Sequence, residues 1–320
     1  MLKKLFLALL TILVLCTACG QSVSTFKPLK SIKVGLLLPE TINDPVWGNK
    51  GYKGLLKIQS EYNAEVFYKE GITTLKSVEE ALREFSEREV NIVFGHGSEY
   101  GTLFQEVHKT YPEINFFYFN GDFSADNVTS LKFESHAMGF FGGMIAAKMS
   151  KTNNIGIIAA FDWQPEIEGF KEGAKYQNPE IHVLTEYTKS WNNEDRAVSA
   201  YENMRASGVD VFYPAGDTFN LEVIEKVKED GLYAIGFVSD QSDLGESIVL
   251  TSTVQHVDHL YELVVAQYLD GTLENGIITF DFKDDVISLG KFSPEIPEDF
   301  RKQVEDAINL YKLKGELPSK

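Results

Sequence analysis

From residue 31 onward the chain alternates between two hydrophobic patterns, and this alternation constrains its fold more than any other feature. Short apolar, β-branched runs end in Gly, Pro or Asn, and longer stretches with helical periodicity follow them. The apolar runs are Ile32–Leu38, Ala64–Tyr68, Asn91–Phe94, Asn115–Asn120, Asn154–Ala159, Ile181–Tyr187, Asp210–Tyr213, Tyr233–Phe237 and Ile248–Thr251. The helical stretches include Gly48–Tyr62, Ser77–Glu87, Tyr100–Tyr111, His136–Lys151, Pro165–Tyr176, Asn193–Ala206, Leu221–Glu229 and Val257–Asp270. Strands that alternate with helices predict parallel sheets covered by helices.

The strands and helices fall into two sets with a similar internal order, at about 31–135 and 153–250. Two lobes fit a chain of 320 residues better than one very wide sheet does. We therefore predict an α/β protein with two doubly wound, Rossmann-like lobes. The expected first lobe covers 31–145 with about 252–288, and the expected second lobe covers 146–251 with about 289–320.

The N-terminal residues predict export and a lipid anchor. Lys3 and Lys4 precede an apolar run that ends at Cys16, and Thr17, Ala18, Cys19 and Gly20 follow. The apolar run, about 12 residues, is shorter than the roughly 20 that a membrane-spanning helix needs. We expect a signal peptide over 1–19, a lipid on Cys19, a tether over 20–30 and a location on the extracytoplasmic face of the cell membrane. The alternative is a cleaved signal without a lipid.

Composition narrows the classes of partner. Asp and Glu number 47 against 30 Lys and Arg, for a net charge of -17. Such an acidic surface repels phosphate, so we expect no direct binding of nucleic acid. It also repels anionic lipid, so the anchor must provide the attachment to the membrane. Both cysteines lie in the leader, which excludes disulfides and cysteine-based metal sites from the mature chain.

Candidate ligand-binding residues follow the predicted strands, because open parallel sheets bind ligands beyond the carboxyl ends of their strands. These strand ends are rich in aromatic, amide and carboxylate side chains, as at Asn120-Gly121-Asp122 and Phe161-Asp162-Trp163. Stacking faces with fixed hydrogen-bond partners suit a neutral, flat, hydroxylated small molecule.

A set of segments carries a resemblance to a known family. They are Asn43-Asp44 with Trp47, Gly51-Tyr52-Lys53-Gly54, the run 138–143 with Ala146-Ala147, 169–173, 208–211, 234–236 with 239–241, and 250–253. In this order they resemble the basic membrane protein family of substrate-binding lipoproteins, which includes purine-nucleoside receptors of ABC importers. The resemblance implies a type I periplasmic-binding-protein fold, with two lobes joined by a hinge. The stretches NDPVWGNKGYKGLL, GHGSEYGTLF, AMGFFGGM and SDQSDLGES resemble a branch described as positive regulators of competence gene expression.

The resemblance also implies roles for single residues. An aromatic side chain in the first loop stacks on the base in nucleoside-binding members, and Trp47 stands there; Gly216 matches a glycine that exposes its backbone. The full set of expected ligand-binding residues is Asn43, Asp44, Trp47, Gly97, Asn120, Phe161, Gly216, Phe219 and Asp240. Three positions depart from the family, because Asn120 and Val238 replace aspartates and Gln255 replaces a lysine. Each lost hydrogen bond to a charged group costs roughly 1.5–3 kcal/mol, so either the ligand differs or binding has decayed.

The remaining sequence motifs bear on enzyme activity, metal binding and membrane insertion, and they favour none of the three. The chain lacks G-x-S-x-G, H-E-x-x-H and GxxxxGK[ST], so we expect no enzyme activity and no cofactor. His256 and His259 lack a third ligand nearby, and we expect no metal site. The small residues between Gly139 and Ala147 favour close packing of a helix against a strand over a membrane span. Two functions stay open: a regulatory lipoprotein that acts through a protein partner, and the ligand-binding subunit of an ABC importer with a permease partner.

Overall fold

The computed structural model describes residues 32–44 and 46–319, and its first sheet is wholly parallel. The strand order is β11-β5-β4-β3-β1-β2, and every neighbouring pair is parallel. The strands are β1 (Lys33–Leu37), β2 (Glu65–Lys69), β3 (Ile92–Gly95), β4 (Asn115–Phe119), β5 (Val128–Phe133) and β11 (Ile277–Phe280). The central strands are buried because helices cover the sheet, which explains their nearly continuous apolar sequences.

The second sheet repeats this order as β12-β10-β9-β8-β6-β7, with only β12 antiparallel at the edge among the pairs that the structure describes. Its strands are β6 (Asn154–Ala159), β7 (His182–Tyr187), β8 (Val211–Ala215), β9 (Tyr233–Val238), β10 (Val249–Gln255) and β12 (Ile287–Leu289). Two sheets with interleaved helices confirm the predicted α/β class and its two lobes.

Each lobe contains one long helix pair. In the first lobe α2 (Gly48–Tyr62) packs against α9 (Val257–Asp270), and in the second α5 (Ser135–Met149) packs along α6 (Pro165–Gln177). The other helices are α3 (Leu75–Glu87), α4 (Tyr100–Val107), α7 (Glu194–Ala206), α8 (Phe219–Glu229) and α10 (Glu298–Lys314), with short 3-10 turns at His108–Thr110, Ser242–Leu244 and Phe282–Asp284.

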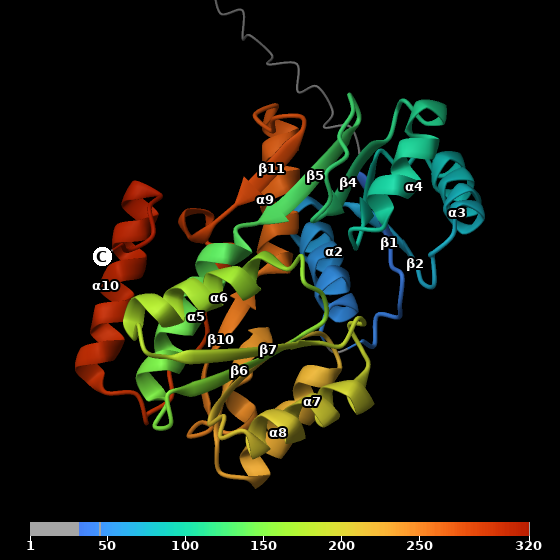
Figure 1. The fold of residues 1–320 in the computed structure, drawn as a ribbon. Helices are drawn as coiled ribbons and strands as arrows, with labels where there is room; N and C mark the ends of the chain where they lie inside the picture. Colours follow the sequence, from blue (N-terminus) through green and yellow to red (C-terminus); the bar gives the residue numbers. More distant parts are fainter. Residues whose placement is uncertain (1–31, 45, 320) are drawn as a thin grey trace, which may run out of the picture. The chain divides into compact units, whose positions relative to one another are not determined.

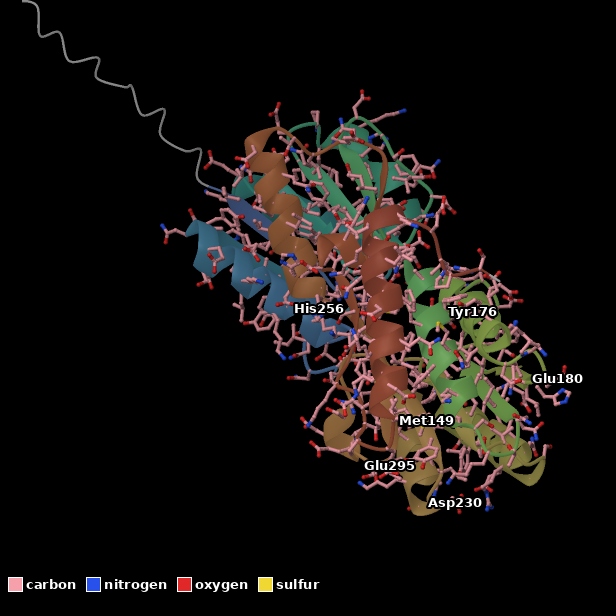
Figure 2. The ribbon with its side chains drawn as sticks, turned by 90° about the vertical axis from the view of Figure 1, so that its left-hand side faces the viewer. Met149, Tyr176, Glu180, Asp230, His256 and Glu295 are labelled. Atoms are coloured by element: carbon pink, nitrogen blue, oxygen red, sulfur yellow. The ribbon has the colours of Figure 1, made fainter. Side chains whose placement is uncertain are left out.

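The chain passes between the two sheets after β5, after β10 and between β11 and β12. Backbone hydrogen bonds connect these crossings: the Glu134 N–H donates to the Phe280 carbonyl at 2.8 Å, and the His256 N–H donates to the Val286 carbonyl at 2.8 Å. His256, labelled in Figure 2, directly precedes α9. The segments that cross between the lobes are therefore hydrogen-bonded to one another, as expected of a hinge.

Two of the expected lobe boundaries fall inside secondary-structure elements. The boundary at 145/146 falls inside α5, which packs along α6 and against β10. The return to the first lobe at about 252 falls inside β10, which is part of the second sheet. In the structure the first two of the three crossings lie near Glu134 and His256.

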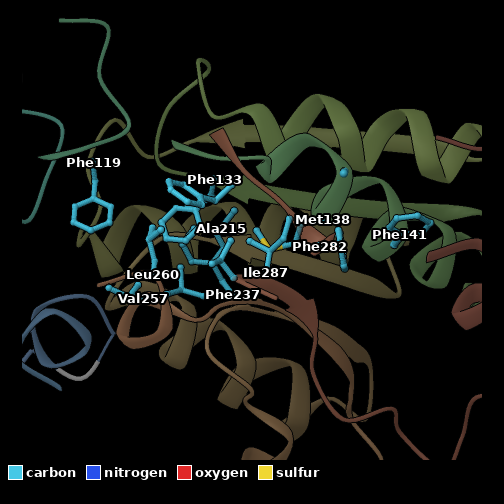
Figure 3. Packing of buried hydrophobic residues seen from close by; sticks show 14 of the residues in the cluster. Phe119, Phe133, Met138, Phe141, Ala215, Phe237, Val257, Leu260, Phe282 and Ile287 are labelled. Carbon is cyan, nitrogen blue, oxygen red and sulfur yellow. The ribbon is translucent and has the colours of Figure 1, made fainter. Parts of the chain in front are cut away.

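One apolar cluster extends through both lobes. Phe119 and Phe133 of the first lobe and Phe237 of the second belong to the same buried cluster, together with Leu260. Burial of apolar side chains stabilises the folded chain by about 25 cal/mol per Å², so this shared cluster stabilises both lobes. Figure 3 labels these four residues within the buried cluster.

Glycines bring α5 and α6 into backbone contact. A Cβ at Gly143 would collide with the Phe170 carbonyl, and one at Gly173 would collide with the Phe140 carbonyl. The expectation that these small residues pack against a strand was therefore wrong for Gly139 and Gly143, which pack against a helix; Gly142 faces the sheet. Within 32–44 and 46–319, no helix has the length and apolar character of a membrane span.

Candidate ligand-binding site

A cavity of about 870 Å³ lies between the lobes at the carboxyl ends of the strands. We call it the interlobe cavity. Its lining is Pro39, Glu40, Thr41, Asp44, Trp47, Gly48, His96, Gly97, Ser98, Glu99, Phe119, Asn120, Asp122, Lys132, Phe133, Ser135, Phe161, Trp163, Gln164, Pro165, Glu166, Lys189, Ser190, Trp191, Asn192, Asp217, Thr218, Phe237, Val238 and Gln255. Its size matches small-molecule sites, and both lobes contribute to its wall.

Trp47 is held rigidly in the wall of the first lobe. Its indole stacks on His96 with ring centroids 4.4 Å apart, and Phe119 meets it edge-on at 5.6 Å. Its Nε1–H donates to the His96 carbonyl at 3.1 Å. Asp44 positions the backbone here, because its carboxylate accepts hydrogen bonds from the N–H groups of Val46, Trp47 and Gly48 where α2 begins. The indole is thus fixed before any ligand arrives.

His96 supports this arrangement as a neutral, fully buried side chain. Its Nε2 lies 2.8 Å from the Trp47 carbonyl, and its Nδ1 lies 3.0 Å from the Tyr261 hydroxyl. A carbonyl only accepts, so Nε2 carries the proton and Nδ1 accepts from Tyr261. Burial lowers the pKa of His96 to about 4, despite the hydrogen bond to Trp47.

The fourth strand of each sheet ends in the same unusual backbone conformation. Asn120 after β4 has φ +55°, and Val238 at the end of β9 has φ +62°. Asparagine tolerates the left-handed region, whereas a β-branched valine there is strained. Both residues line the interlobe cavity, and strain of this kind is typical of functional sites.

The second lobe presents three aromatic rings that contact one another. Phe161 stacks on Trp163 with centroids 5.4 Å apart, and Trp191 meets them edge-on at 5.3 Å and 5.8 Å. We call Phe161, Trp163 and Trp191 the aromatic cluster. Trp163 is 54% exposed, which is unusual for so large an apolar side chain.

Buried amides brace the strand ends of the second lobe. Gln164 accepts from the Phe161 N–H at 2.8 Å and donates to the Ala215 carbonyl at 3.1 Å, joining the loops after β6 and β8. Gln241 accepts from the Phe237 N–H at 2.8 Å and donates to Asn220 at 2.6 Å. Hydrogen bonds satisfied in this way fix the loops that carry the lining.

Carboxylates from both lobes face the cavity. Burial, with the nearby charges of Asp44, Glu99 and Glu40, raises the pKa of Asp217 to about 7. Glu166 is also buried, and burial raises its pKa even though Gln164 donates to it at 2.9 Å. Asp217 belongs to the second lobe and the other three acids near it to the first, so like charges oppose one another across the cavity.

Five of the nine expected ligand-binding residues line the interlobe cavity: Asp44, Trp47, Gly97, Asn120 and Phe161. The other four do not appear in the lining. Asn43 is exposed outside it. Phe219 is fully buried in the core of the second lobe, and Gly216 lies against its ring. Asp240 accepts hydrogen bonds from the N–H groups of Ser242 and Lys291, so it organises a turn.

Sequence reasoning did not include Asp217, Glu99 and Trp191 among the expected residues, although all three line the cavity. Each lies within a few residues after a predicted strand, so the strand-end rule could have found them. The three positions that depart from the family, Asn120, Val238 and Gln255, all line the cavity. In the described part of the chain no group of three or more His, Cys, Asp or Glu side chains could hold a metal ion.

Known proteins that are similar to this chain indicate its family. A family model described as "ABC transporter substrate-binding protein PnrA-like" (Bmp) matches residues 31–319. The chain belongs to the Bmp family. This membership confirms the resemblance to basic membrane proteins that the sequence motifs indicated. The family model thus describes substrate-binding proteins of ABC transporters.

Two relatives of this Bmp chain share names connected with gene regulation. It is 52% identical over 308 residues to "Transcriptional activator protein med" of Bacillus subtilis (strain 168), covering 96% of each chain. The crystal structure of "a Transcriptional Activator of comK gene" from Bacillus halodurans is 45% identical, with a TM-score of 0.85, and the match covers 90% of this chain and all of the other. An ABC transporter solute-binding protein of Aeropyrum pernix K1 is 19% identical with a TM-score of 0.75, covers 90% of this chain and 94% of its own, and shows the fold alone.

Proposed function

We propose that this chain is a small-molecule receptor on the outer face of the cell membrane, and that it regulates competence gene expression. The observation that carries the receptor role is the interlobe cavity of about 870 Å³, with a fixed indole on one side and the aromatic cluster on the other. A ligand that contacts both lobes favours their closed arrangement, which supplies a conformational signal. The regulatory role is supported by the 52% identity to the relative named as a transcriptional activator.

The place on the membrane follows from the leader. Cys19 and residues 1–30 lie outside the described residues, and the proposal rests on their sequence alone. A lipid on Cys19 would hold the lobes outside the cell, so the output must pass through a membrane protein. The net charge of -17 argues against direct binding of DNA.

A second candidate is the ligand-binding subunit of an ABC importer for a nucleoside, with a permease as the partner. The family description favours this role. Asn120, Val238 and Gln255 weigh against a nucleoside, because they replace charged residues in the lining. Valine can neither donate nor accept a hydrogen bond, so a ribose hydroxyl would lose its partner at Val238.

Ligand binding is tested by the thermal unfolding of the purified full chain with nucleosides, nucleobases, small amines and small hydroxylated compounds. A ligand that binds only the folded chain raises its Tm by mass action. We expect a rise with at least one class, and a smaller rise for Trp47→Ala. Leu313→Ala, at a side chain that is 84% exposed, is the matched control. The receptor role fails if no compound raises the Tm or if Trp47→Ala responds like the wild type.

The two outputs are separated in cells. Deletion of the gene should alter expression of competence genes while nucleoside uptake stays normal, and Trp47→Ala should reproduce the deletion. Reduced nucleoside uptake with unchanged competence expression would instead support the importer role.

A further inference from the structure

The charges in the lining of the interlobe cavity do not balance. The acidic side chains are Glu40, Asp44, Glu99, Asp122, Glu166 and Asp217, and the lysines are Lys132 and Lys189. Both lysines have acidic partners: Lys132 lies 2.6 Å from Asp122, and Lys189 lies 3.5 Å from Asp162. His96, with a pKa lowered to about 4 by burial, adds no positive charge near neutral pH.

Several of these carboxylates have no cationic partner in the described part of the chain. Asp44 is occupied by the backbone N–H groups at the start of α2. Glu40, Glu99, Glu166 and Asp217 form no ion pair there. Unpaired carboxylates in a partly enclosed site are costly, and a bound cation would remove that cost.

Asp217 is the carboxylate best placed to receive a ligand. Its backbone N–H donates to the Trp191 carbonyl at 2.9 Å, which places it beside the aromatic cluster. Asn220 donates to the Asp217 carbonyl at 2.6 Å and so holds the turn, while among the described contacts the carboxylate itself has no hydrogen bond. Asp217 therefore lines the cavity with a carboxylate that accepts no hydrogen bond from the described residues, and its backbone is bonded to that of Trp191 in the aromatic cluster.

The aromatic cluster supplies the second requirement of a cation site. Faces of Trp and Phe attract ammonium and guanidinium groups, and the attraction grows when the site excludes water. Phe161, Trp163 and Trp191 meet at centroid distances of 5.3–5.8 Å, in a mixture of stacked and edge-on contacts. Trp163 remains 54% exposed at the cavity, so its ring is available for contact with a ligand.

We infer that the interlobe cavity binds a small organic cation whose charge lies between Asp217 and the aromatic cluster. This inference rests on the proposed receptor function and specifies the ligand class. Primary amines, guanidinium compounds and quaternary ammonium compounds all meet the requirement. A bare metal ion does not, because no three ligating side chains of the described residues come close enough to hold one. The cation would also screen Asp217 from the acids of the first lobe and so favour closure.

The test compares cations with neutral compounds of the same shape. The purified full chain is titrated by calorimetry with choline, benzylamine and butylguanidine, and with the neutral carbon analogue of choline, benzyl alcohol and butylurea. Adenosine and guanosine are included as neutral hydroxylated ligands. We expect at least one cation to bind about tenfold or more tighter than its neutral counterpart.

Two isosteric variants locate the charge. Asp217→Asn should weaken binding of that cation by about tenfold or more, because the amide keeps the shape but loses the charge. Asp243→Asn, at an exposed acid of the same lobe outside the lining, removes one charge as well and should bind the cation as the wild type does.

The outcomes separate the inference from the function on which it rests. If a nucleoside or another neutral compound binds and the cations do not, or if Asp217→Asn binds the cation as the wild type does, the cation inference is wrong and the receptor role stands. If no compound of either kind binds, both are wrong.

Discussion

The two lobes have the same strand order, yet their helix pairs pack differently. In the first lobe, Gly54 of α2 lies against the ring of Tyr261 on α9. In the second lobe, glycines of α5 and α6 bring backbone against backbone. The first arrangement inserts an aromatic side chain whose hydroxyl hydrogen-bonds His96, which in turn stacks on Trp47. The first lobe thus uses its helix pair to fix the indole at the cavity.

The second lobe holds its cavity wall by other means. Its helix pair is closed by glycine, and buried amides at Gln164 and Gln241 tie the strand-end loops together. Phe161 and Trp163 of the aromatic cluster lie on the loop that Gln164 ties down, Trp191 follows β7, and Trp163 stays exposed. The comparison suggests a preformed face on the first lobe and an adaptable, charged face on the second, and the following predictions test it.

The largest effect is expected at the glycine contact. Gly143→Ala should lower the free energy of unfolding by about 4 kcal/mol, because the new methyl meets the Phe170 carbonyl and the helix backbones must separate. Gly142→Ala is the control, since its Cβ would find no atom nearer than 3.5 Å. It should be neutral or stabilising by about 0.5–1 kcal/mol through helix propensity. Urea denaturation of both variants measures the free energy of unfolding. Equal losses in the two variants would contradict the backbone contact between α5 and α6.

The second effect concerns pH and the first lobe. The pKa of His96 is about 4 in the folded chain against 6.5 in the unfolded chain, so below pH 6.5 the unfolded state binds more protons. Stability should therefore fall by about 3 kcal/mol as the pH drops from 6.5 to 4 on account of His96 alone. His96→Gln should reduce this loss of stability at acid pH, whereas His182→Gln, at an exposed histidine, should leave the loss unchanged. The measure is the free energy of unfolding at several pH values.

The third effect has the opposite sign and concerns the second lobe. The pKa of Asp217 rises from 3.8 to about 7 through burial and the acids Asp44, Glu99 and Glu40, so the folded state binds more protons between these values. The ionisation of Asp217 therefore destabilises the folded state as the pH rises from about 4 to about 7. Asp217→Asn should stabilise the empty protein by about 2 kcal/mol above pH 7, after allowance for partial exposure, and by nothing below pH 4. A difference independent of pH would contradict this account.

The smallest effect tests the paired turns after β4 and β9. Val238→Asn should relieve about 1 kcal/mol of backbone strain, because asparagine accepts a positive φ more readily than valine, so it should destabilise the chain less than Val249→Asn, at a valine that is also buried. Asn120→Val should cost about as much at the matching turn of the first lobe. Thermal unfolding of the three single variants, without ligand, measures these changes, and equal losses for Val238→Asn and Val249→Asn would remove the parallel between the turns.

Much of the fold could be predicted from periodicity. The nine predicted strands and eight predicted helical stretches all occur, with ends displaced by a few residues. The prediction omitted β5, β11, β12 and α10. Val128–Phe133 contains Thr, Ser and Lys, and β11 and β12 are short edge strands, so none has the continuous apolar run of a central strand. The predicted boundary at 145 falls inside α5, whose glycines contact α6, a long-range pairing that one helix pattern does not reveal.

The position of the cavity could be predicted from the sequence, but only some of the residues that line it could. Strand-end reasoning found Trp47, Asn120 and Phe161, because the carboxyl ends of parallel strands meet at one edge. It could not separate Phe219, which turns into the core, from Trp191, which lines the cavity, since both follow a strand and both are aromatic. The charge imbalance required the structure, because the ion pairs of Lys132 and Lys189 are set by folding.

The central claim is that one ligand contacts both lobes. Calorimetric titration of the tightest-binding compound against Trp47→Ala, Trp191→Ala and the exposed-site control Leu313→Ala tests it directly. The account predicts that each tryptophan variant loses about tenfold or more in affinity, while the control binds as the wild type does. Wild-type affinity in either tryptophan variant would contradict a site shared between the lobes.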